Sequence, residues 1–108
     1  MDQRKFPRIK TKIAAEVNNR QALLENISRK GIKIKLWSDA VPTTCDMMVT
    51  FTVGEQTINL KGEIRWCRRE KNSFQDLKEM GLYLEDAPEE YYKFVDALSN
   101  RRESAVRI

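Results

Sequence analysis

The sequence predicts an all-β fold, a six-stranded antiparallel barrel followed by one C-terminal α-helix. Six short segments alternate apolar and polar residues with a period of two, as half-buried strands do. The last segment repeats its apolar residues at helical spacing, and the total of 108 residues suits a single domain. A sheet of six strands removes its exposed edges by closing on itself, so a barrel is favoured over an open sheet.

Period-two alternation defines the strands in order along the chain. In the third strand, for example, three aliphatic residues alternate with Lys33 and Lys35, whose ammonium groups should point outward. Asn18–Asn19 and Gly54–Glu55 are typical of the tight turns that join two strands in a hairpin. The predicted strands cover residues 12–17, 20–27, 32–36, 47–53, 58–66 and 80–84.

The fifth strand carries the most specific expectations. Its phase places Trp66 in the core and Arg65 on the outer face. Gly62 lies inside the run, where a missing side chain commonly marks a bulge or bend that lets a sheet curl. The polar segment 68–79 that follows is predicted to be a loop.

The final element is predicted to be an amphipathic helix of about three turns. Tyr91, Val95 and neighbouring apolar residues recur at helical spacing, and Asp86 and Glu89 are placed like a capping box. Tyr91 and Phe94 are expected to cover one end of the barrel.

The composition excludes several classes of protein. The chain has no histidine, the most common general base near neutral pH, so we expect no enzymatic activity. Cys45 and Cys67 form no Cys-x-x-Cys pair, so neither a disulfide framework nor a zinc site is expected, and both thiols should be reduced. No metal or cofactor is expected. No segment approaches the roughly 20 apolar residues of a membrane span, and no signal region follows the first residues. A cytoplasmic protein is expected.

Charge is distributed unevenly along the chain, whose net charge is +4. Residues 1–35 hold ten Lys or Arg against three acids, whereas residues 70–92 hold two against seven. The N-terminal part is therefore suited to meet an anion. The expected organisation is a flexible basic arm at 1–11, the barrel with its helix at 12–100, and a tail at 101–108.

Two short motifs carry the expected chemistry. Arg4 and Arg8 form an Arg-x-x-x-Arg, and Asn26, Ser28 and Gly31 form an Asn-x-Ser-x-x-Gly. A guanidinium can pair with guanine O6 and N7 or with phosphate oxygens, and its flat face can stack on a base. An amide oxygen can accept from guanine, a serine can bond a phosphate or amino group, and glycine permits unusual backbone conformations.

In the order and spacing of these motifs, the chain resembles the PilZ family of cyclic di-GMP receptor domains, in which an Arg-x-x-x-Arg arm precedes an [Asp/Asn]-x-Ser-x-x-Gly. Segments 62–66 and 80–86 also look like later strands of that family, and the closing helix fits. The resemblance implies a six-stranded antiparallel barrel and a receptor that binds cyclic di-GMP and signals to a protein partner.

The resemblance also implies roles for the motif residues. Arg4 and Arg8 would grip guanine and phosphate, Asn26 and Ser28 would read the guanine edge, and Gly31 would shape the loop. The alternative roles are a solvated basic arm for the two arginines and a turn bonded to its own backbone for Asn26 and Ser28. The presence of both motifs in one chain favours the binding site.

Two other functions remain open on the sequence. One is a protein-interaction adaptor of the same fold that binds no nucleotide. The other is a small basic barrel for single-stranded nucleic acid, which is disfavoured because the strand aromatics Phe51 and Trp66 have inward phase rather than an exposed, base-stacking one. Loss of signalling on substitution of Arg8 by alanine would favour the receptor over the adaptor.

Overall fold

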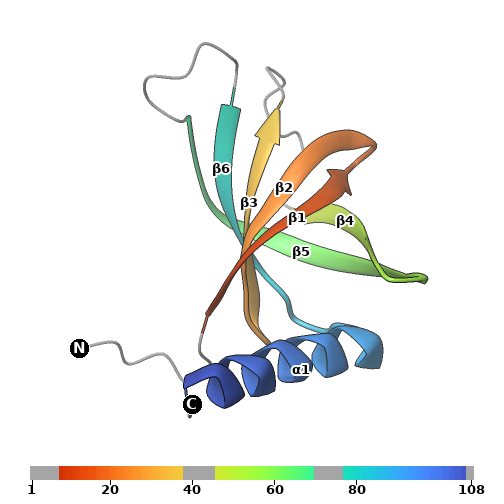
Figure 1. The fold of residues 1–108 in the computed structure, drawn as a ribbon. Helices are drawn as coiled ribbons and strands as arrows, with labels where there is room; N and C mark the ends of the chain where they lie inside the picture. Colours follow the sequence, from red (N-terminus) through yellow and green to blue (C-terminus); the bar gives the residue numbers. More distant parts are fainter. Residues whose placement is uncertain (1–7, 38–45, 70–76, 107–108) are drawn as a thin grey trace.

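The computed structural model describes residues 8–37, 46–69 and 77–106, with side chains described up to residue 100. These residues form six strands and one helix (Figure 1). The elements are β1 (Ile9–Val17), β2 (Arg20–Ile27), β3 (Gly31–Trp37), β4 (Asp46–Val53), β5 (Gln56–Arg69), β6 (Leu77–Tyr83) and α1 (Glu89–Val106).

The strands close into one antiparallel barrel in the order β1-β2-β3-β6-β5-β4, which confirms the predicted fold class. Closure runs through a short pairing of β1 with β4, in which Val17 faces Val49. The two predicted hairpin turns are present. Asn18 and Asn19 have φ of 49° and 68°, and Gly54 has φ of 61°, which is the left-handed backbone that such turns require.

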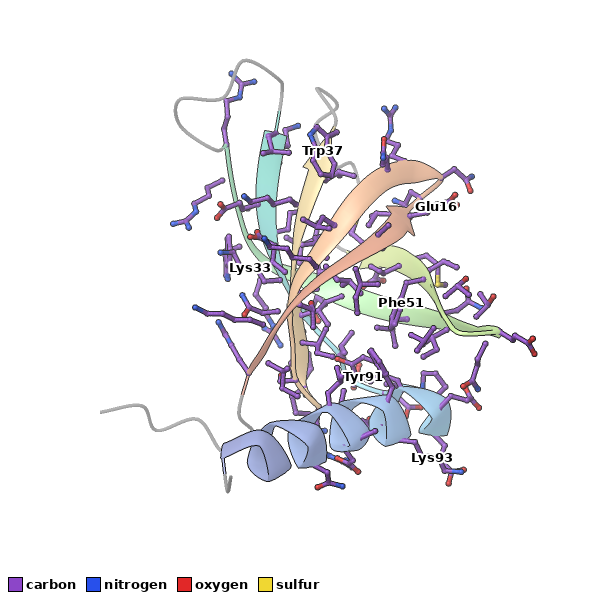
Figure 2. All side chains as sticks on the ribbon, in the orientation of Figure 1. Glu16, Lys33, Trp37, Phe51, Tyr91 and Lys93 are labelled. Carbon is purple, nitrogen blue, oxygen red and sulfur yellow. The ribbon has the colours of Figure 1, made fainter. Side chains whose placement is uncertain are left out.

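One apolar core fills the barrel and extends to α1, which lies across one end of it (Figure 1). Tyr91 is fully buried between the helix and the strands (Figure 2), and the Phe94 ring lies 5.9 Å from that of Phe51. The predicted cover of the barrel end is therefore confirmed. Burying side chains of this size stabilises a fold by roughly 1.5–3 kcal/mol each. Within the described residues, α1 is too polar to cross a membrane.

Three register shifts interrupt the strand pairing in the described residues, and the first lies in β1 between Lys10 and Ile13. In β2 the register shifts between Leu24 and Asn26, and in β5 it shifts between Ile64 and Trp66. The prediction that Trp66 lies in the core is wrong: the bulge reverses its phase, and the side chain is 37% exposed. Gly62 itself pairs in regular register and faces inward, so the irregularity lies beyond it.

Several elements are longer than the sequence predicts. β1 begins at Ile9, inside the expected arm, because that side chain is buried in the core. β5 and β6 extend into the segment 68–79 predicted as a loop, where Arg68 and Glu79 pair across the strands. The helix begins two residues later than the capping-box pattern predicts and has 18 residues instead of about three turns, because no Gly or Pro stops it before Val106.

Candidate ligand-binding site

A row of residues crosses five strands on the outer face of the barrel. Paired neighbours run from Lys10 on β1 through Asn26 on β2, Lys33 on β3 and Gly81 on β6 to Trp66 on β5. The bulges in β2 and β5 build this row, because without them simple alternation would turn Asn26 and Trp66 toward the core. Figure 2 shows Lys33 on this outer face, away from the core residue Phe51.

A cavity of about 350 Å³ lies along this row, lined by residues of β2, β3, β5 and β6, of the turn between β2 and β3, and by Arg8 just before β1. It brings together four of the five residues that the sequence predicts for the site: Arg8, Asn26, Ser28 and Gly31. Arg4 lies outside the described residues. The remaining lining residues are Lys30, Ile32, Lys33, Arg65, Trp66, Gly81, Leu82 and Tyr83. Arg8 of the first motif and the residues of the second motif, which are separate in sequence, therefore share one concave surface.

The turn between β2 and β3 is tied together by Ser28 and Gly31. The Ser28 hydroxyl donates to the Gly31 carbonyl and accepts from the Gly31 N–H, both at 3.1 Å. With its proton on that carbonyl, the hydroxyl retains a lone pair that can accept from a ligand N–H. Ser28 is 6% exposed. It can therefore stabilise the turn and contact a ligand at the same time only if the ligand lies in the cavity that Ser28 lines.

Gly31 allows two strands to approach each other closely and does not adopt an unusual backbone conformation. Its φ is not in the left-handed region, whereas that of Gly54 is. A Cβ at Gly31 would lie 3.1 Å from the Leu82 carbonyl oxygen, a distance shorter than most contacts of a Cβ atom in proteins. The expectation that Gly31 supplies a backbone conformation that other residues resist is therefore wrong; it lets β3 pack tightly against β6.

Aromatic and arginine side chains line the other wall of the cavity. The indole of Trp66 lies directly over Gly81, at whose Cα a side chain would collide with it. The Arg68 guanidinium lies 5.4 Å from the Trp66 ring centre, and that of Arg65 lies 4.6 Å from the Tyr83 ring centre. The sequence placed Arg65 on this face but missed Trp66, because a bulge leaves no clear mark on an alternating pattern. Tyr83 has outward phase between the buried Leu82 and Leu84, but nothing in the sequence singled it out as a site residue.

Glu79 organises the cations behind the cavity. It is 8% exposed and accepts two hydrogen bonds from Arg68, at 2.7 and 3.0 Å, while the Lys33 ammonium lies 3.6 Å away. Lys33 also lies 4.0 Å from Glu25, the residue at the β2 bulge. The Arg68 hydrogen bonds, with the fields of nearby lysines, hold the pKa of Glu79 below its ordinary value of 4.5 despite burial, which acts in the opposite direction.

The lowered pKa of Glu79 predicts a pH-dependent stability. The folded state binds this proton less readily than the unfolded chain, so the stabilisation is present above pH 4.5 and is lost as pH falls through the lower folded pKa. Between about pH 5 and about pH 3, the free energy of unfolding should fall less steeply for Glu79→Gln than for the wild type. Urea denaturation across this range measures it. Glu55→Gln, at an exposed hairpin turn, is the matched control, and equal slopes for Glu79→Gln and wild type would contradict the prediction.

The family of the chain follows from comparison with known proteins. The sequence matches the PilZ domain family over residues 2–99, so the chain belongs to that family. PilZ domains are non-catalytic receptor or adaptor domains that bind cyclic di-GMP and interact with partner proteins. A search of curated proteins found no match.

A solved structure shares the fold. The structure of the Bacillus subtilis inhibitor of motility (MotI/DgrA) superposes with a TM-score of 0.74 at 16% sequence identity. The match covers 97% of this chain and 53% of that one, so the present chain spans about half the length of this neighbour. At this identity the likeness concerns the barrel and its helix.

Proposed function

We propose that this chain is a non-enzymatic receptor for cyclic di-GMP that signals to a protein partner. One observation carries the proposal: Arg8, the last residue of the first motif, lines the same cavity as Asn26, Ser28 and Gly31 of the second. Arg4, in the segment before Arg8, belongs to the proposed site by its place in the motif.

The chemistry of the cavity matches the ligand. Cyclic di-GMP offers two phosphodiesters, two guanine edges and two aromatic faces. Arg8, Lys30 and Lys33 supply positive charge for the phosphates, and Asn26 can accept from the guanine N1 or N2 donors. The exposed indole of Trp66 provides a surface on which a guanine can stack, a contact worth about 1–3 kcal/mol per base.

Calorimetric titration with cyclic di-GMP tests the proposal, with cyclic di-AMP as the matched control. The two ligands share the phosphodiester ring and differ in the base edge. Because Asn26 and Ser28 are proposed to read guanine, cyclic di-AMP should bind at least about tenfold more weakly. The same titration gives the ligand stoichiometry. No heat at high micromolar cyclic di-GMP, with the circular dichroism of the fold intact, removes the proposal.

Single-stranded nucleic acid is the second candidate, because the structure exposes Trp66 beside Arg65 and Arg68. Of the two strand aromatics predicted to face inward, only Phe51 is buried. An oligonucleotide that binds with steep salt dependence and without regard to base identity would favour this function. Selective binding of cyclic di-GMP favours the receptor, since a general nucleic-acid surface has no reason to prefer a closed guanine dinucleotide.

A further inference from the structure

Helix α1 holds the turn that contains the second motif. The buried Tyr91 hydroxyl donates to the Ser28 carbonyl oxygen at 2.5 Å. Arg29, at a variable position of the motif, points to the helix: its Nη1 lies 3.0 and 3.1 Å from the two carboxylate oxygens of Asp96. The same guanidinium lies 4.6 Å from the Tyr92 ring centre.

Ser28 therefore has two sides. Ser28 lines the cavity together with Gly31, to which its hydroxyl is bonded, and its carbonyl oxygen accepts a hydrogen bond from the helix. Burial raises the pKa of Tyr91 above its ordinary range, so its hydroxyl remains a donor at any physiological pH. The Lys30 carbonyl is held as well, by the N–H of Leu84 at 2.8 Å, in the segment that leads into α1.

We propose that Arg29 and Tyr91 are positioning residues that couple occupancy of the cavity to the docking of α1 against the barrel. This inference rests on the proposed function. A turn held by the helix in its ligand-competent shape loses less conformational freedom on binding, and a ligand that orders the turn must in return stabilise the docked helix, because coupling between two sites is reciprocal. Through this coupling, α1 would carry the state of the cavity to another face of the molecule.

The Arg29–Asp96 pair allows a clean test, because it lies at the surface, with side-chain exposures of 39% and 60%, and such a pair contributes little to stability. Arg29→Ala and Asp96→Ala should each weaken cyclic di-GMP binding by about threefold to fivefold. The two substitutions change net charge in opposite directions, so a long-range field would weaken binding in one and tighten it in the other. The charge-swapped variant Arg29→Asp with Asp96→Arg should restore affinity to within about twofold of wild type.

Lys93→Ala is the matched control. Lys93 lies on α1, pairs only with Glu89 among the contacts described, at 3.6 Å, and points away from the barrel (Figure 2). Its loss removes the same charge as Arg29→Ala without touching the turn, so affinity should not change. Tyr91→Phe should weaken binding more than Arg29→Ala, because it leaves the Ser28 carbonyl without its buried donor.

Hydrogen exchange gives the reciprocal measurement. Cyclic di-GMP should slow amide exchange in residues 89–98 of the wild type, and this slowing should shrink in Arg29→Ala. If the wild type binds but the Arg29 and Asp96 variants bind equally well and exchange in α1 is unchanged by ligand, the coupling is refuted and the receptor stands. If the wild type binds no cyclic di-GMP, the proposed function and the coupling both fall.

Discussion

Arg8→Ala is expected to weaken cyclic di-GMP binding by roughly 10- to 100-fold, the scale of one charge-assisted hydrogen bond of about 1.5–3 kcal/mol. Arg8 is exposed, immediately precedes β1 and lines the cavity, so its removal should cost affinity and not folding. Calorimetry measures the affinity and thermal denaturation the stability. The melting temperature without ligand should stay close to that of the wild type.

Arg20→Ala is the matched control for Arg8→Ala. Arg20 is also exposed, but it begins β2 at the hairpin after Asn18–Asn19 and does not line the cavity. Both variants lose one positive charge, so a general reduction of the field would affect them equally. Equal affinities for the two variants would contradict a direct contact from Arg8. In cells, loss of the signalling output in Arg8→Ala would separate a receptor from an adaptor, which keeps its output.

Most of the fold could be predicted because alternation and turn chemistry agree along most strands. The hairpin turns at Asn18–Asn19 and Gly54–Glu55 use residues that tolerate the left-handed backbone conformation. Their positions could therefore be predicted from the residue types alone. Strand ends were less predictable. Lys78 and Glu79 are buried in β6, although their polarity alone indicates a loop. The Glu79 carboxylate can be buried in a strand because it pairs with Arg68.

Only those residues of the candidate site that belong to a short sequence motif could be predicted. Asn26, Ser28 and Gly31 stand close together in the sequence, and Arg8 belongs to a short pattern of its own. Trp66 was missed because its exposure depends on a bulge, which is fixed by pairing between β5 and β6 and not by the composition of either strand. Simple alternation therefore gives the wrong face for Trp66, which the β5 bulge turns outward toward the cavity.

Gly81 leaves the space that the Trp66 indole occupies, so a substitution at Gly81 is expected to have a large effect. Gly81→Ala should destabilise the protein by about 1–2 kcal/mol, because the new Cβ would lie 2.1 Å from the Trp66 Nε1 and must displace the indole. The displaced indole no longer lines the cavity. Cyclic di-GMP affinity should therefore fall by about tenfold or more, as for Trp66→Ala, since either change removes a stacking surface.

A double-mutant cycle identifies the cause. The three atoms nearest to the new Cβ all belong to the Trp66 indole, so a Trp66→Ala background removes these collisions. The Gly81→Ala change should then be neutral or stabilise slightly, because alanine reduces the freedom of the unfolded chain and the backbone of Gly81 is not left-handed. Urea denaturation of the four proteins gives the interaction energy. An equal cost of Gly81→Ala in both backgrounds would show that the backbone of β6, and not the indole, requires the glycine.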